Sequence, residues 1–90
     1  MAWLGMNLEI VNGELPKWES LAEEIDTIIT NVNTQVVEAN EAWNGTDSEK
    51  FVSDWEGQHR PQLMSVKNLI TSLSTQLQGE IAEQRAKSGQ

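Results

Sequence analysis

The sequence predicts an all-α fold, an antiparallel helix-turn-helix hairpin that dimerises into a four-helix bundle. Two long segments carry apolar residues at helical spacing, and a stop-and-start signal at Trp43-Asn44-Gly45 separates them near the middle of the 90 residues. The chain has no cysteine, so no disulfide can stabilise so small a domain. The predicted layout is a single domain with an arm at 1–12, a first helix at about 14–42, a turn at 43–46, a second helix at about 47–86 and a tail at 87–90.

Turn residues mark the start of the first helix. Residues 1–12 have mixed apolar spacing, which fits either an extended arm or a helical lead-in. Asn12-Gly13 interrupts the chain, and Pro16 is tolerated only in the first turn of a helix, where its missing N–H is not needed. The first helix is therefore expected to begin within residues 13–17.

The first helix carries an apolar stripe built from two rows that each repeat every seven residues. One row runs from Trp18 to Ala39 and the other from Ala22 to Trp43. The stripe is wider than the two-position seam of a two-stranded coiled coil, so one neighbouring helix would not cover it. The residues predicted here for the core and the dimer interface are Trp18, Leu21, Ile25, Ile28, Ile29, Val32 and Val36.

The segment after Trp43 ends one helix and begins another. Gly45 suits the left-handed conformation that follows a helix end. Thr46-Asp47-Ser48-Glu49 matches the capping box, in which Thr46 accepts a hydrogen bond from the Glu49 amide while the Glu49 side chain reaches back. A connection this short makes the two helices antiparallel.

The second helix has one broad apolar face and one weak stretch, Gly57 to Pro61. A proline inside a helix removes one hydrogen bond and crowds the carbonyl four residues earlier, so we expect a kink there without a break. Phe51 and Trp55 are expected to pack near the turn. The core and dimer-interface residues predicted farther along are Leu63, Val66, Ile70, Leu73 and Leu77.

Composition excludes several function classes. The formal net charge of -8 argues against nucleic-acid binding, which needs clustered Lys and Arg. With one His, no Cys and no Tyr, the chain offers little for catalysis, a cofactor or a metal site, and we expect none of these. The acidic stretch of the first helix fits either a basic partner or a solvated face kept for solubility.

The sequence also argues against a membrane role. No apolar run approaches the roughly 20 residues that a membrane-spanning helix needs. The first residues lack the cationic and apolar regions of a cleavable signal peptide. Surface-active helices usually present Lys and Arg to anionic lipid, so the acidic helix disfavours membrane disruption.

Aromatic residues point to association with other proteins. Trp18 and Trp55 fit a role as filling between helices, whereas Trp43 at the mouth of the turn fits packing against Phe51 and recognition equally well. An isolated hairpin with such wide stripes would expose a contiguous apolar surface, which soluble monomers avoid. We therefore expect a dimer.

Two amphipathic helices around Trp43-Asn44-Gly45, with Phe51 eight positions after the tryptophan, resemble the Trp-x-Gly family of small type VII secretion substrates over nearly the whole chain. The resemblance implies hairpins that dimerise antiparallel and leave the cell folded, without a cleaved signal peptide, through a membrane ATPase. Trp43 and Gly45 would then form the export-recognition turn.

The chain departs from the family pattern at two points. Family dimers commonly carry a Tyr-x-x-x-Asp/Glu export motif after the second helix, and this sequence has no tyrosine. The resemblance then implies the signal-less half of a heterodimer, although a homodimer with a different signal is the alternative. Pro61 is also unexpected for the family. The competing function is a non-secreted structural four-helix-bundle module in which the turn is only a turn.

Overall fold

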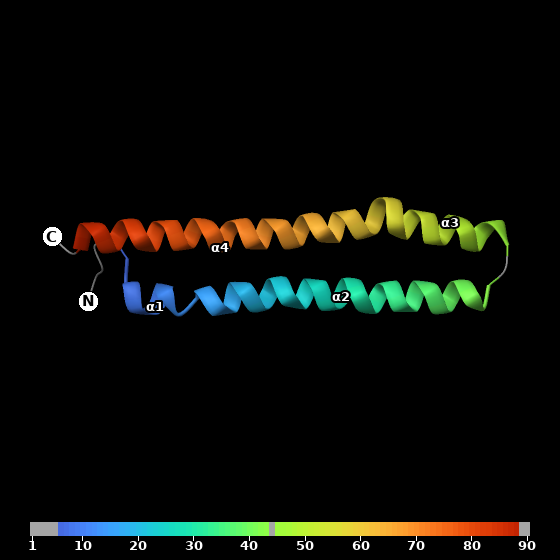
Figure 1. The fold of residues 1–90 in the computed structure, drawn as a ribbon, viewed down its shortest axis with the longest axis horizontal. Helices are drawn as coiled ribbons and strands as arrows, with labels where there is room; N and C mark the ends of the chain where they lie inside the picture. The colour runs from blue at the N-terminus through green and yellow to red at the C-terminus, as the bar shows by residue number, and fades with distance from the viewer. Residues whose placement is uncertain (1–5, 44, 89–90) are drawn as a thin grey trace.

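The protein is described by a computed structural model, which places residues 6–43 and 45–88. Two long antiparallel helical segments lie side by side in a rod of 67 × 18 × 17 Å (Figure 1). The all-helical class with two long helices is confirmed. In chain order the elements are α1 (Leu8–Asn12), α2 (Leu15–Glu41), α3 (Thr46–Asp54), a π-helical turn η1 (Trp55–His59) and α4 (Arg60–Ser88).

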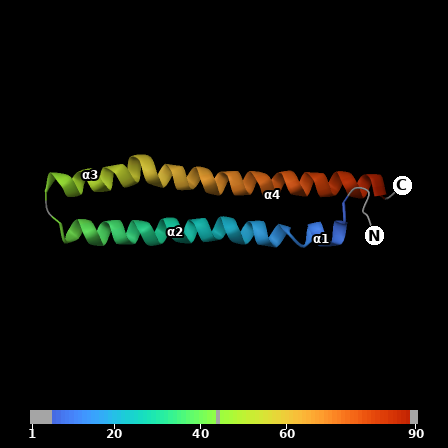
Figure 2. The ribbon, with the colours of Figure 1, turned by 180° about the vertical axis from the view of Figure 1, so that it is seen from behind.

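Residues 1–12 were expected to be either an extended arm or a helical lead-in, and residues 8–12 are helical. The Asn7 side chain begins α1 by accepting a hydrogen bond from the amide of Ile10 at 3.3 Å. Helix α1 contacts α4, and Figure 2 shows α1 beside the C-terminal end of α4. The first five residues and the last two lie outside the described part, so the predicted arm and tail are described only from Met6 and as far as Ser88.

Helix α2 begins and ends within one residue of the predicted bounds. Its first turn contains Pro16, whose missing N–H falls where no intrahelical partner is needed. Residues 30–34 have low helix propensity, yet they are helical because Ile29 and Val36 on either side are buried against the facing helix.

A heptad seam holds the two long segments together. Buried and half-buried residues of each segment follow each other at alternating steps of three and four, as in a coiled coil. In α2 these are Leu15, Trp18, Ala22, Ile25, Ile29, Val32 and Val36. In the other segment they are Ser48, Val52 and Trp55, then Leu63, Lys67, Ile70, Ser74, Leu77 and Ile81.

The π-helical turn keeps this seam continuous. A regular heptad would place the next seam residues after Trp55 at 59 and 62, whereas the seam resumes at Leu63, one residue late. In η1 the amide of Arg60 donates to the carbonyl of Trp55, five residues earlier, and this wider turn holds one extra residue. The extra residue is thereby absorbed, and both parts of the segment face α2.

The predicted kink at Gly57–Pro61 is thus a π-helical turn, and the helix continues through it. It is visible as a bulge between α3 and α4 in Figure 1. Pro61 is the second residue of α4 and lies next to the π-helical turn, in which the α-helical hydrogen-bond pattern is already interrupted.

A cluster of buried apolar side chains lies in the half of the hairpin that is nearer the turn, whereas Ile81 is buried near the other end. Trp55 packs with Ile29 and Val36, and its indole N–H donates to Oδ1 of Asn33 at 3.1 Å. An indole N–H buried without a partner would be costly, so this bond fixes which residue of α2 lies opposite Trp55.

The structure divides the predicted core and interface residues into two groups. Ile29, Val36 and Trp55 are buried, and the half-buried residues are Trp18, Ile25, Val32, Leu63, Ile70 and Leu77. Leu21, Ile28, Val66 and Leu73 do not belong to the core of the hairpin, because they flank the seam and stay exposed. Three of the buried seam residues were not predicted as sites, namely Ser48, Ser74 and Ile81.

The role of the π-helical turn can be tested by deletion. Deleting Gln58 in a Pro61→Ala background removes the extra residue, so an α-helix can connect the two halves of the seam in register. We expect the free energy of unfolding, measured in urea by circular dichroism, to stay within about 1 kcal/mol of the Pro61→Ala parent.

The matched control deletes Thr75, an exposed residue of α4, in the same background. This deletion rotates Leu77 and Ile81 out of the seam and should cost at least about 3 kcal/mol. If both deletions lowered the free energy of unfolding equally, the π-helical turn would not be what keeps the seam in register.

Candidate functional site

The turn is built around Gly45, whose backbone has φ 145° and ψ -179°. This region is accessible essentially only to glycine, so a special conformation was correctly expected at this position. It is not the predicted left-handed helical one, and Gly45 precedes α3 as its N-cap rather than closing α2. Asn44 lies outside the described residues.

The predicted capping box is not formed. Helix α3 begins at Thr46, one residue earlier than the motif requires, and its N-cap makes no side-chain hydrogen bond. The amide of Glu49 donates instead to the carbonyl of Gly45 at 3.3 Å. The buried Ser48 hydroxyl also donates to this carbonyl, at 2.9 Å, so the motif's serine, and not its threonine, ties the turn to the helix.

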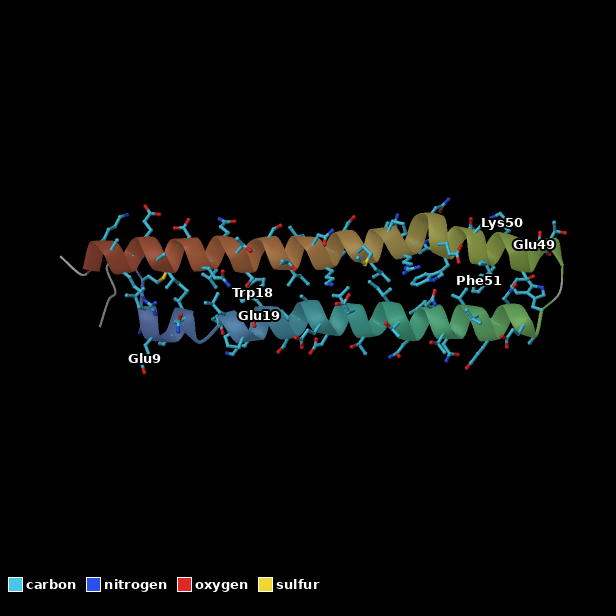
Figure 3. The ribbon with its side chains drawn as sticks, viewed as in Figure 1. Glu9, Trp18, Glu19, Glu49, Lys50 and Phe51 are labelled. Carbon is cyan, nitrogen blue, oxygen red and sulfur yellow. The ribbon has the colours of Figure 1, made fainter. Side chains whose placement is uncertain are left out.

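Trp43 and Phe51 form an aromatic pair across the turn. Their ring centroids are 5.8 Å apart, and the planes are tilted by 46°. Each side chain is 43% exposed, so the predicted packing of a partly wet Trp43 against Phe51 is confirmed. In Figure 3 Phe51 points from α3 toward α2.

One side of the hairpin is apolar along its length. The positions that directly precede the heptad a positions, called g, lie on the same side of the seam in both helices of an antiparallel pair. The large apolar residues at these positions, together with Leu69 from the adjoining c row, form what we call the apolar side. Each of them is 40% to 58% exposed. It consists of Leu21 and Ile28 from α2, Phe51 from α3, and Val66, Leu69 and Leu73 from α4.

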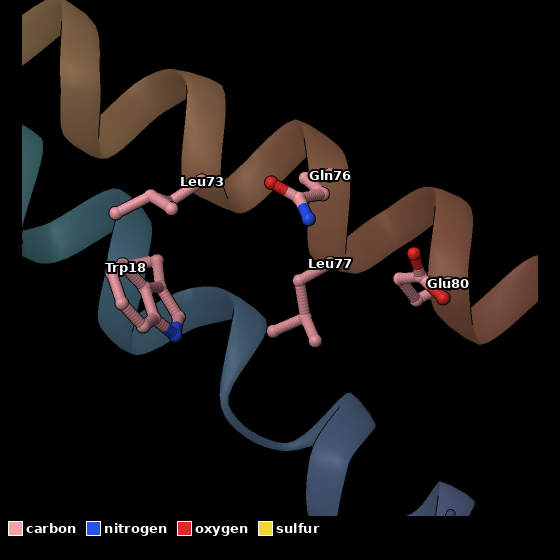
Figure 4. A pocket seen from close by; sticks show the side chains of 5 residues that line it. All are labelled: Trp18, Leu73, Gln76, Leu77 and Glu80. Atoms are coloured by element: carbon pink, nitrogen blue, oxygen red, sulfur yellow. The ribbon is translucent and has the colours of Figure 1, made fainter.

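Two shallow hollows along the seam open on the apolar side. The first, of about 230 Å³, is lined by Trp18, Leu73, Gln76, Leu77 and Glu80 (Figure 4). The second, of about 440 Å³, lies nearer the turn. Its lining residues are Asn31, Val32, Gln35, Val36, Ala39 and Phe51.

The opposite side of the seam is polar. Its e positions carry Glu19, Asp26 and Asn33 on α2, where Asp26 forms an ion pair of 2.7 Å with Lys67. On the other segment the e positions are mostly polar, with Met64 as the apolar exception. They include Glu56, Met64, Thr71, Gln78 and Arg85. The hairpin is therefore two-sided, and only one side has the composition of a protein-binding surface.

Among residues 6–43 and 45–88, no group of three or more His, Cys, Asp or Glu side chains could hold a metal ion. His59, the one histidine, is exposed. Within the same ranges, no helix combines the length and apolar character needed to cross a membrane.

Comparison of the chain with protein-family models, with curated proteins and with solved structures found no match.

The two tryptophans near the turn should respond very differently to truncation. Trp43→Ala removes a half-exposed ring with one aromatic neighbour and should lower the free energy of unfolding by only about 1 kcal/mol. Trp55→Ala opens a cavity in the core and leaves Oδ1 of Asn33 without its hydrogen-bond donor, so it should lower the free energy of unfolding by about 3 to 5 kcal/mol. Urea unfolding curves measure both, and a loss at Trp43 as large as that at Trp55 would contradict the placement.

Proposed function

We propose that this chain is a non-enzymatic interaction protein that forms one half of a four-helix bundle and is exported, without a cleaved signal peptide, by a type VII secretion machine. The apolar side carries the first part of this proposal. A stripe of six large apolar side chains, joined to two hollows, is larger than the scattered apolar residues that a soluble monomer ordinarily exposes.

The exposed area also supports association. The accessible surface of the chain is 6776 Å², whereas a compact monomer of this mass exposes about 5,300 Å². The excess of about 1,500 Å² exceeds the roughly 800 Å² that each partner buries in a standard interface. A second hairpin packed along the apolar side would cover an area of this order and complete a four-helix bundle.

Export is proposed from the resemblance to the Trp-x-Gly family. Trp43 is partly exposed at the end of the rod, beside Phe51, where a partner's tail or the secretion ATPase could contact both rings. Because the chain has no tyrosine, we propose that a second Trp-x-Gly protein supplies the Tyr-x-x-x-Asp/Glu motif. The alternative is a non-secreted structural bundle, favoured by the full structural explanation of the turn as a turn.

The proposed bundle can be tested by comparing two single substitutions, each of which places a carboxylate at an exposed apolar position. Leu69→Glu places a carboxylate on the apolar side and should weaken association, measured by sedimentation velocity, by at least about tenfold. Val37→Glu is the matched control, since Val37 is 48% exposed at a b position, away from the apolar side. Equal effects of the two substitutions would count against the apolar side as the interface.

The export role can be tested at Trp43. Trp43→Ala should abolish secretion while the helical content and association are retained, because a half-exposed ring contributes little to the hairpin itself. Immunoblots of cell and culture fractions measure secretion, and Val37→Ala serves as the control. Unchanged secretion of the Trp43 variant would contradict the export role of the turn. Secretion that persists after the Tyr motif of a co-encoded partner is deleted would contradict the proposed heterodimer. Loss of folding alone in the Trp43 variant would favour the non-secreted alternative.

A further inference from the structure

We infer that the apolar side accepts a helical hairpin of a different chain, one whose rim carries lysine or arginine, in preference to a second copy of this chain. The inference rests on the proposed four-helix bundle and names the chemistry of the partner. It follows from the distribution of carboxylates along the edges of the apolar side.

Every lysine of the chain forms an ion pair with a carboxylate of the same chain. Lys17 pairs with Glu14 at 2.8 Å, and Lys67 pairs with Asp26. The other two pairs are Lys50 with Asp54 at 2.9 Å and Lys87 with Glu83 at 3.5 Å. Four of the 14 carboxylates are thereby paired, and the other ten have no ion pair among the described residues.

Several of these ten carboxylates border the apolar side. Glu24 and Glu38 lie at c positions of α2, one row outside Leu21 and Ile28. Glu80 lies at a g position of α4, one heptad beyond Leu73. The α2 edge of the apolar side is therefore acidic, and its end on α4 carries the carboxylate of Glu80, which has no ion pair among the described residues.

The lysines on the same two edges are Lys17 on α2 and Lys87 on α4. Each is already paired within its own helix. Of the two arginines, Arg60 begins α4 after the π-helical turn, and Arg85 lies on the polar side. Neither edge thus offers an uncommitted lysine to a second copy.

A second copy of the chain would meet like charge in either orientation. If its α2 or its α4 lies along an edge of the first copy, carboxylates face carboxylates, because both helices carry them at the rim. Like charges at an interface suppress a wrong partner, and a basic rim would convert the same positions into attractive pairs.

The hollow beside Trp18 shows how one such cation could be held. Trp18 from α2 lies opposite Leu73 and Leu77 of α4, with Gln76 and Glu80 along the α4 edge (Figure 4). The aliphatic part of a lysine or arginine can pack on the ring and on Leu77, while its charge reaches the Glu80 carboxylate. Glu80 forms no ion pair with any described residue that would compete.

The probe is a charge-reversed form of the chain itself, Glu24→Lys/Glu38→Lys/Glu80→Lys, which supplies the same apolar side with a basic rim. In about 50 mM salt, wild type should bind this variant at least about tenfold more tightly than it binds itself. Sedimentation equilibrium and fluorescence titration of labelled chains measure both affinities. The preference should shrink when salt is raised to about 500 mM.

The matched control is Glu19→Lys/Glu23→Lys/Glu56→Lys, which changes net charge equally but at exposed positions off the apolar side. It should show a much smaller preference for wild type. Glu80→Gln in the wild-type chain should weaken binding to the charge-reversed probe, and Glu19→Gln should not.

A neutral variant, Glu24→Gln/Glu38→Gln/Glu80→Gln, gives a second readout if the reversed chain folds poorly. It should self-associate more tightly than wild type in low salt because the like-charge repulsion at the rim is removed. Two results would overturn the inferred preference for a basic rim while leaving the proposed bundle intact. One is that wild type binds itself as tightly as it binds the charge-reversed chain, and the other is that wild type prefers the control variant over itself by the same factor. A complete absence of association among all these chains would overturn the proposed bundle, and the inference with it.

Discussion

The continuity of the heptad seam through the π-helical turn is the constraint on which the rest of the structure depends. The spacing from Trp55 to Leu63 in the seam is one residue longer than a regular heptad allows. In an uninterrupted α-helix this extra residue would rotate the side chains of α4 by roughly 100° away from α2. The wider turn absorbs that residue, and the bond between Trp55 and Asn33 fixes the register beside it. Leu77 and Ile81, more than 20 residues later, face the partner helix for this reason.

The same register decides which residues remain outside. Once the a and d positions of both segments meet at the seam, the neighbouring g positions fall on one side, and they include the large apolar residues Leu21, Ile28, Phe51, Val66 and Leu73. The e positions on the other side are mostly polar. A hairpin held by a single narrow seam buries few large side chains, and in the proposed four-helix bundle a second hairpin would cover the apolar side that this seam leaves outside. The turn with Trp43 and Phe51 lies at the end of the rod and contributes little to the seam, which leaves it available for recognition.

Much of the fold could be predicted because its signals are local. Helical spacing, Pro16 and Gly45 placed both long segments to within about two residues. Core and outer residues could not be separated, since both groups repeat every seven residues and only the register of the facing helix distinguishes Ile29 from Ile28. The seam also uses Ser74 and Lys67, which carry no apolar signal. The capping box failed because Gly45 takes an extended backbone with positive φ and the Ser48 hydroxyl binds its carbonyl.

Small-angle X-ray scattering of the dilute chain tests most directly whether an extended hairpin carries its apolar side on the outside. The Cα radius of gyration of the hairpin is 20.2 Å, whereas a compact domain of this length would have about 12 Å. We predict a value close to 20 Å with high helical content. A value near 12 Å would mean that the chain folds back to bury the apolar side within itself, and this would contradict the account.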